Sequence, residues 1–391
     1  MDQQRLLTWR SLLRQHGEAF LHWLDDRNWA NATLDRIADQ LAHFLIMLVD
    51  LAKEEASEAP IRFWNSIPTV RACCNDLSTY QDPIAVAAYA YVHFLERYRR
   101  TILALEYLTS CYALPLGSRG VLVLDVGTGP ACSLYAIDDF YQALREWANE
   151  AGVEELVIPS SELHCIEQSH SMVWFFHRFS EHCGRSGPFR PEFADFRGLN
   201  LSERRAWQRR QYEYEEWWNP ETEEYEEVYV GIDPAVEALF RYRLIIFSNF
   251  LTTNSKVSQL ERKLSALFQE LSAGSVVLIL GGTGDNYQQI YASIAQIAKR
   301  EGLRESNWHT DGLAAEKNSE EAAGIIKQAQ YRVYLYLESL VGSDALAKNK
   351  SFPDYWNPQP SPKARPKFAL RVFRRGRWPI QKGRRRGITT A

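Results

Sequence analysis

The sequence lacks the features that mark membrane-spanning and secreted proteins. Its longest apolar run, from Leu41 to Leu51, is interrupted by His43 and Asp50 and is too short to cross a bilayer. The N-terminus does not show the basic and then apolar pattern of a signal peptide. These absences predict a soluble cytoplasmic protein that makes no contact with a membrane.

Metal-binding patterns are also missing. The 391 residues include six cysteines, but no two of them form a C-x-x-C pair, which fits buried thiols that stay reduced. Four histidines from His164 to His182 are separated by six, seven and five residues, so they do not share a helical face at the i, i+4 spacing of a zinc pair. We therefore expect no metal site.

The charges are unevenly distributed along the chain. The net charge is −4, yet the stretch from Lys363 to Arg386 has eleven Lys or Arg and no acid, while the rest has 34 basic and 49 acidic residues. Phe368, Phe373 and Trp378 lie among these basic residues, a combination that suits phosphate contact and base stacking. We expect residues 376–391 to be a flexible basic tail whose partner is RNA or a ribonucleoprotein.

One stretch organises the rest of the chain. Residues 121–126 are apolar apart from Asp125 and predict a strand buried on both faces, and Gly127 and Gly129 then interrupt it before a helical pattern opens at Ala131. Glycine permits positive φ and close approach of the backbone to a ligand, and a helix N-terminus offers unpaired N–H groups. The pattern is typical of a turn that binds a nucleotide or a nucleotide-like cofactor.

Neighbouring residues indicate which cofactor. A dinucleotide fingerprint would have Gly or Ala where this chain has Cys132, which disfavours a nicotinamide-dependent oxidoreductase. The chain instead reads Asp-x-Gly-x-Gly-Pro from Asp125, which resembles motif I of the class I S-adenosylmethionine (SAM)-dependent methyltransferases. The resemblance implies SAM as cofactor, with its methionine part held by Asp125, Gly127, Thr128 and Gly129, and Ala131 in place of the usual third glycine. A turn that binds nothing is the alternative.

The same resemblance implies the fold. We expect an α/β protein with a doubly wound, seven-stranded, mostly parallel sheet of the class I methyltransferase type. Residues 1–115 show helical spacing of apolar residues and predict an α-helical N-terminal domain, with a helix start at Asp82-Pro83. Residues 116–375 would form the SAM-binding Rossmann-like domain. Its later strands are expected at 163–167, 191–196, 243–251, 275–280 and 367–374, the last as the antiparallel seventh strand.

Further cofactor contacts are expected at the ends of the second and third strands. Glu167 ends the second strand, where a carboxylate can accept both ribose hydroxyls of an adenosine-containing cofactor. Gln168 follows it in a turn that resembles the family's acid-x-Ser-x-x-Met turn. Asp195 and Phe196, at the end of the third strand, occupy the place where family members contact the adenine.

The fourth strand is expected to end at the acceptor. The segment Ser248-Asn249-Phe250-Leu251 lies where the family's motif IV faces the sulfonium, which implies Ser248 on the cofactor side and Asn249 and Phe250 on the acceptor side. Many amino-group methyltransferases of nucleic acid have Asp/Asn-Pro-Pro-Tyr/Phe here, and its absence disfavours that subclass.

Residues 199–232 look inserted into this pattern. Two acidic, aromatic-rich runs flank Asn219-Pro220 and predict a β-hairpin. We expect the hairpin to be a lid or a docking surface for a protein partner, and its acidity argues against direct contact with nucleic acid.

These observations favour a SAM-dependent methyltransferase with a macromolecular acceptor, RNA or a ribosomal particle. Two alternatives remain: a small-molecule methyltransferase with the N-terminal helices as the roof of its pocket, and a catalytically silent SAM-binding interaction protein. Methyl transfer needs the acceptor held in line with the methyl group, so a dedicated base is optional. The sequence does not indicate the oligomeric state.

Overall fold

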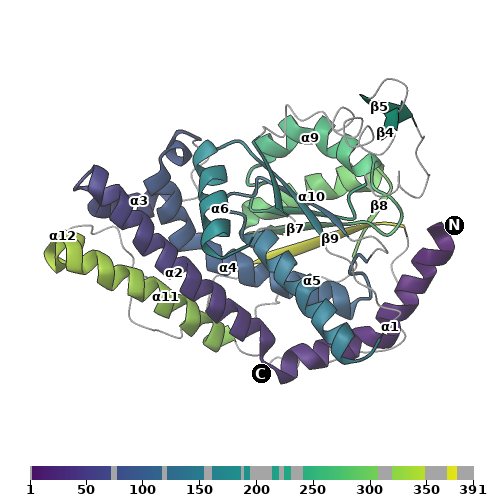
Figure 1. Ribbon diagram of the computed structural model, residues 1–391, viewed down its shortest axis with the longest axis horizontal. Helices are drawn as coiled ribbons and strands as arrows, with labels where there is room; N and C mark the ends of the chain where they lie inside the picture. The colour runs from purple at the N-terminus through teal and green to yellow at the C-terminus, as the bar shows by residue number, and fades with distance from the viewer. Residues whose placement is uncertain are drawn as a thin grey trace.

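The computed structural model describes residues 2–71, 77–116, 121–153, 161–185, 189–193, 214–219, 224–229, 241–306, 319–347 and 368–376 (Figure 1). The described helices are α1 (Asp2–Asp26), α2 (Trp29–Glu55), α3 (Ala59–Arg71), the 3-10 helix η1 (Leu77–Gln81), α4 (Pro83–Ser110), α5 (Cys132–Glu150), α6 (His170–His182), α9 (Asn254–Gln269), α10 (Asp285–Arg300), α11 (Ser319–Val341) and α12 (Ser343–Ala347). The described strands are β1 (Leu122–Val126), β2 (Glu162–Glu167), β3 (Phe189–Phe193), β4 (Tyr214–Asn219), β5 (Glu224–Tyr229), β6 (Leu244–Ser248), β7 (Val276–Gly281), β8 (Leu303–Glu305) and β9 (Ala369–Arg375).

The main sheet of the described residues has the strand order β3-β2-β1-β6-β7-β9-β8. The first five are mutually parallel, and β9 runs antiparallel between β7 and β8. This is the α/β, mostly parallel arrangement expected from the sequence, including the antiparallel last strand. Six of the strands have five to seven residues, whereas β8 has three and was not located by sequence analysis. β1 lies inside the sheet between β2 and β6, and its residues are buried on both faces, which explains its largely apolar composition.

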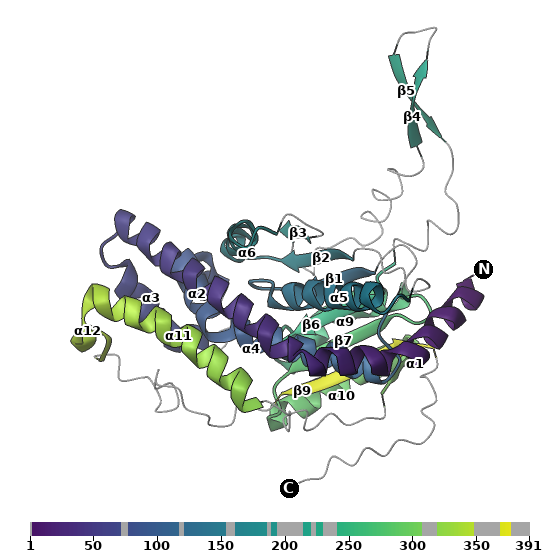
Figure 2. The ribbon, with the colours of Figure 1, turned by 60° about the horizontal axis from the view of Figure 1, so that its bottom comes forward.

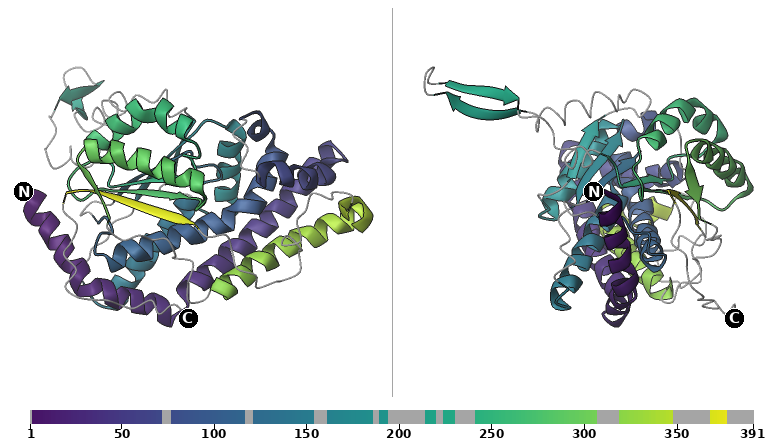
Figure 3. Two further views of the ribbon diagram at one scale, coloured as in Figure 1. Left: turned by 180° about the vertical axis from the view of Figure 1, so that it is seen from behind. Right: turned by 90° about the vertical axis from the view of Figure 1, so that its right-hand side faces the viewer.

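Helices cover both faces of this sheet. Alternate residues of β1 point to opposite sides: Leu122 and Leu124 pack in a core with α9 and α10, and Val123 packs in a larger core with α4, α5 and α6. Figure 3 shows α9 and α10 on the side of the sheet opposite to the N-terminal helices. The three-layer arrangement leaves the carboxyl ends of the parallel strands at one edge, where open α/β sheets bind ligands.

A second helical layer lies outside α4. Helices α2 and α11 run side by side (Figures 1 and 2) and are joined by hydrogen bonds from Asn31 to Glu321 (2.8 Å between Nδ2 and Oε2) and from Tyr336 to Asp50, and by an ion pair between Arg332 and Asp39. Helix α11 follows β8 in the chain, so residues from Ser319 onward pack with the helices that the sequence placed in residues 1–115.

The inserted segment forms its own small sheet. Strands β4 and β5 pair antiparallel, with Tyr214 opposite Tyr229 and Asn219 opposite Glu224, as the sequence predicted. Figure 2 shows this pair standing away from the main sheet. Its proposed role as a lid or docking surface stays a prediction.

Side-chain caps mark several helix starts. Asp82 accepts a hydrogen bond from the backbone N–H of Ile84 (3.0 Å) and Pro83 occupies the first turn of α4, as predicted. Ser169 and Thr253 cap α6 and α9 in the same way. In the part of the chain that the structure describes, no helix combines the length and the hydropathy that crossing a membrane requires.

Candidate functional site

The glycine turn after β1 can only be made with glycine at its first position. Gly127 has φ 66°, and its N–H donates to the carbonyl of Ile166 on β2 (2.9 Å). A Cβ at Gly127 would lie 2.1 Å from Cδ2 of Phe250, which overlies the turn from the end of β6. The close approach brings the expected cofactor side and the expected acceptor side of the site together.

The turn continues through two more positive-φ residues. Gly129 has φ 58° and Ala131 has φ 64°, and Ala131 is the fully buried N-cap of α5. A left-handed conformation costs a residue with a Cβ roughly 1–2 kcal/mol. Ala131, at the usual third-glycine position, therefore adopts the left-handed conformation that a glycine would have there, at an energetic cost, and its methyl group is buried in the core.

Asp125 lies beneath this turn and is fully buried. Its Oδ2 accepts a hydrogen bond from Thr128 Oγ1 (2.6 Å), while its Oδ1 has no hydrogen-bond partner among the described residues. The pKa of Asp125 is raised to about 7. Burial is the main cause and the nearby Glu167 acts in the same direction, while the Thr128 hydroxyl and the Arg97 charge oppose the rise. A buried acceptor oxygen without a partner points to a ligand that supplies a donor.

Glu167 ends β2 beside the turn, where the sequence placed it. Its Oε2 accepts from the backbone N–H of Gly129 (2.8 Å), and its Oε1 accepts from the N–H groups of Gln168 (2.9 Å) and Ser169 (3.0 Å). Burial raises the pKa of Glu167, and these three backbone donors oppose that effect. The carboxylate therefore ties the turn after β2 to the glycine turn, with Gln168 contributing through its backbone.

Helix α4 contributes two side chains that sequence reasoning missed. Arg97 is buried, with its guanidinium 4.9 Å from the Tyr89 ring centroid and donating to the Tyr89 hydroxyl, and its charge lowers the pKa of both Asp125 and Cys132. Tyr89 lies 3.7 Å from where a Cβ on Gly129 would be. The i, i+4, i+8 spacing of Tyr89, His93 and Arg97, which places the three on one helical face, was the available signal.

His93, between them on this face, is held neutral. Burial lowers its pKa to about 3, and the positive charge of Arg97 acts in the same direction. Its Nε2 lies 3.2 Å from the carbonyl oxygen of Val70. The positive charge on this face of α4 is therefore carried by Arg97.

The segment before α4 is fastened over the turn after β2. Ser169 Oγ donates to the carbonyl of Tyr80, and Ser171 Oγ donates to that of Gln81 (2.7 Å). The Tyr80 ring in turn packs edge-on against Tyr89 (5.3 Å between centroids). The 3-10 helix η1 and the start of α4 thus roof the carboxyl ends of β1 and β2.

The turn between β6 and α9 forms the opposite wall. Ser248 is buried, and its Oγ has no hydrogen-bond partner within the described ranges. Asn249 has φ 54°, and its N–H donates to the carbonyl of Leu280 (2.8 Å). Lys256 on α9 lies 3.9 Å above the Phe250 ring, and its charge also lowers the pKa of Glu167. Phe250 therefore meets the glycine turn, and Ser248 ends β6 two residues before it. The predicted roles of both residues stay predictions.

Two groups of predicted residues have other outcomes. Asp195 and Phe196 lie outside the described residues.

Phe368 and Phe373 are buried at or in β9, so the expectation that they stack on RNA bases is wrong: their rings fill the two cores of the sheet. Arg375, counted with the basic stretch, donates to the carbonyls of Glu301 and Phe268 and acts within the fold.

No cluster of three or more His, Cys, Asp or Glu side chains suited to a metal ion occurs in the part of the chain that the structure describes. The site therefore consists of a strained glycine turn, two buried carboxylates, a buried guanidinium and an aromatic wall.

Comparison with solved structures finds similar folds at low identity. The CcbJ methyltransferase from Streptomyces caelestis matches with 12% identity and a TM-score of 0.37, over 77% of this chain and 100% of that one. A phosphoethanolamine N-methyltransferase 2 from Haemonchus contortus, solved with phosphomonomethylethanolamine and S-adenosylhomocysteine, matches with 11% identity and a TM-score of 0.35, over 75% of this chain but only 59% of its own length. The cyclase SpnF also matches, with 10% identity and a TM-score of 0.31, over 66% of this chain and 76% of that one.

No protein-family model and no curated protein sequence matches the chain. At such low identity and with TM-scores below 0.4, these matches do not indicate the reaction of this chain. We therefore base the function on the geometry of this site.

Proposed function

We propose that this protein binds SAM at the glycine turn and is a methyltransferase. The observation that carries the proposal is the pair of opposite charges at the turn, the buried Asp125 with an unpartnered oxygen and the buried Arg97 whose charge reaches it. An amino acid end with an ammonium and a carboxylate is complementary to such a pair. NAD has a pyrophosphate in the corresponding place, which a buried carboxylate would repel.

The residues present fit the cofactor along its length. Asp125 and Ser248 have buried oxygens without hydrogen-bond partners in the described ranges, and Gly127 and Gly129 add no side chains of their own to the turn. Asp125 and Arg97 would hold the methionine end, and Glu167 would accept from the ribose hydroxyls. Asp195 and Phe196 remain the proposed adenine contacts.

Bound SAM supplies a methyl group activated by its positively charged sulfur. What the protein must do is orient the acceptor in line with that group and exclude water. Phe250 covers the turn, and η1 with the start of α4 closes the opposite side, so both walls exclude solvent. Asn249, held at positive φ beside Phe250, would orient the acceptor through its amide.

We favour a small-molecule acceptor. The roof formed by η1 and α4 contacts the turn itself, which suits an enclosed acceptor better than a polymer. The burial of Phe368 and Phe373 weakens the stacking argument for RNA, and Trp378 lies outside the described residues. A macromolecular acceptor, RNA or a ribosomal particle bound through the basic residues after Gly376, is the second candidate, and a silent SAM-binding protein the third.

Transfer of labelled methyl from SAM to separated pools of small metabolites and of RNA distinguishes these candidates. We expect label in the small-molecule pool, and a loss of at least tenfold in turnover for Asn249→Gly, which removes the amide but suits the positive φ. Gln259→Ala, on the exposed face of α9, is the control.

Label in RNA alone would refute the small-molecule acceptor and support the second candidate, a methyltransferase that acts on RNA. Binding of SAM with no label in any pool would favour the silent protein. Unchanged turnover in Asn249→Gly would remove Asn249 from the acceptor side.

A further inference from the structure

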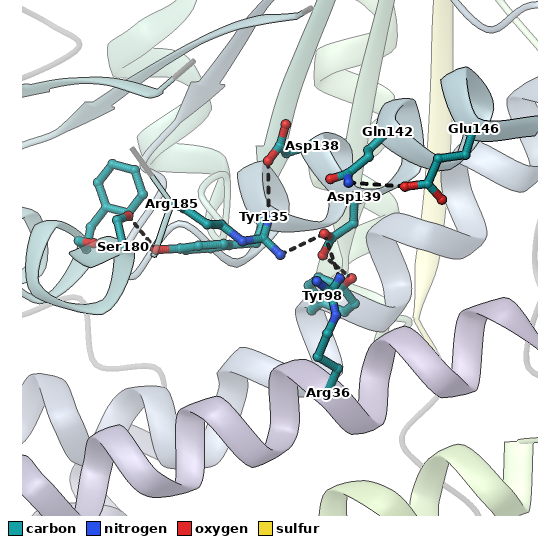
Figure 4. Close-up of polar contacts among 10 residues, drawn as sticks. Arg36, Tyr98, Tyr135, Asp138, Asp139, Gln142, Glu146, Ser180 and Arg185 are labelled. Atoms are coloured by element: carbon teal, nitrogen blue, oxygen red, sulfur yellow. Dashed lines mark hydrogen bonds and ion pairs between the residues drawn. The ribbon is translucent and has the colours of Figure 1, made fainter. Parts of the chain in front are cut away.

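A buried polar cluster joins the helices on the Arg97 side of the sheet (Figure 4). At its centre is Asp139 on α5, whose side chain is 2% exposed. Its Oδ1 accepts from Arg36 on α2 (2.9 Å) and from Arg185, which follows α6 (2.7 Å), and its Oδ2 accepts from the Tyr98 hydroxyl on α4 (2.6 Å). One carboxylate thus contacts groups from three other segments.

The hydroxyl of Tyr98 is a fixed donor in this cluster. Tyr98 is fully buried, and burial together with the neighbouring Asp139 carboxylate raises its pKa well above the ordinary value, so the phenol keeps its proton. Because Asp139 is shielded from water, a lost partner cannot be replaced cheaply by solvent. The contact therefore ties α4 to α5 within their shared apolar core.

Tyr98 is the residue directly after Arg97. Successive residues of a helix are rotated by about 100° around its axis. Tyr98 therefore contacts α5 while Arg97 faces Tyr89 and the glycine turn. A second contact, from Thr101 Oγ1 to Ser133 Oγ (3.3 Å), ties the next turn of α4 to the first turn of α5. The rotation of α4 that aims Arg97 is therefore fixed by contacts to the helix that begins at the cofactor turn.

We propose that Asp139 is a positioning residue that, through Tyr98, aims Arg97 at the carboxylate of the cofactor. The inference rests on the proposed function, since it assumes that SAM is the ligand. It assigns a role in cofactor discrimination to a carboxylate that touches neither cofactor nor acceptor. Its consequence is specific: loosening the contact weakens recognition of the carboxylate end and leaves the rest of the ligand unaffected.

Calorimetric titration with SAM and with decarboxylated SAM, which lacks only the carboxylate, tests this. We expect the wild-type protein to prefer SAM, and Tyr98→Phe and Asp139→Asn each to weaken SAM binding by about tenfold while binding decarboxylated SAM as before. Tyr98→Phe keeps the ring in the core, so it remains informative where Asp139→Asn fails to fold. The matched control is Asp138→Asn, which removes an ion pair with Arg185 (3.2 Å) one residue away.

An unchanged preference in Tyr98→Phe would overturn the inference. Equal weakening of both ligands would do the same, because it would indicate general loosening. Both results leave the proposed function standing, whereas a wild-type protein that binds neither ligand refutes the proposed function and the inference with it.

Discussion

Two buried charges of opposite sign define the site at the scale of single residues. Burial raises the pKa of Asp125, whereas the Thr128 hydroxyl and the Arg97 charge lower it. Both groups are buried, and taking a charge out of water costs stability that other protein groups or a ligand must offset. We interpret the pair as a pre-organised receptor for the zwitterionic end of the cofactor.

The affinity for SAM should therefore rise with pH. Since the pKa of Asp125 is raised to about 7, the ligand-free carboxyl is largely protonated at pH 6 and ionised at pH 8. Only the ionised form attracts an ammonium, so binding releases a proton near neutral pH, and affinity should increase by roughly threefold to tenfold from pH 6 to pH 8. Titrations in buffers of different ionisation enthalpy measure that proton.

Asp125→Asn should bind more weakly and without this pH dependence. A wild-type affinity that is flat across the same range would contradict the role of Asp125. The effect on folding has the opposite sign: because the folded-state pKa is raised from 3.8, the contribution of Asp125 to stability is greatest below about pH 4 and is lost as the pH rises to about 7.

Sequence analysis found the site residues that belong to the strand ends and missed those on α4. Asp125 and Glu167 follow from their places at the ends of buried strands, where the fold itself brings side chains together. Arg97 lies in a helix, and whether its face meets the sheet or solvent depends on packing that no local pattern specifies. The same limit explains the error over Phe368 and Phe373, whose alternation fits a buried strand as well as a stacking surface.

The glycine turn is the element on which the site depends. Gly127→Ala should abolish SAM binding and lower the midpoint of urea unfolding, because its Cβ would overlap the Phe250 ring and force the wall of the site outward. Gly152→Ala is a matched control, since Gly152 has a similar φ of 61° with nothing within 4 Å of an added Cβ.

We expect the control to lose only about 1–2 kcal/mol of unfolding free energy, the cost of a left-handed alanine, and to bind SAM normally. Equal behaviour of the two variants would show that backbone strain, and not the contact with Phe250, explains the need for glycine at position 127.

At the scale of elements, helix starts and long strands were easier to predict than a short strand or the pairing of helices far apart in the sequence. The Asp82-Pro83 start of α4 and the strands from β1 to β7 in the main sheet follow local rules of capping and apolar runs, although β3 begins two residues before the predicted strand. β8 has only three residues and is defined by pairing with β9, so no periodicity could indicate it. The pairing of α11 with α2 depends on contacts such as Asn31 with Glu321, 290 residues apart.

For the molecule as a whole, the helical layer and the sheet form one continuous structure around the site. The larger core contains residues of α1 to α6 and of α11 together with one face of the sheet. The N-terminal helices therefore share a hydrophobic core with the sheet. Through α4 they place Arg97 and Tyr89 near the turn after β1. This arrangement is what makes a roofed, small-acceptor site our preferred interpretation.

The central claim is that the turn after β1 binds SAM. Calorimetric titration of the purified protein with SAM, S-adenosylhomocysteine and NAD, repeated on Glu167→Ala, tests it most directly. We predict micromolar binding of the first two ligands, loss of that binding in the variant, and no heat of binding with NAD. Binding of NAD, or no binding of SAM and S-adenosylhomocysteine by the folded wild-type protein, would contradict the account.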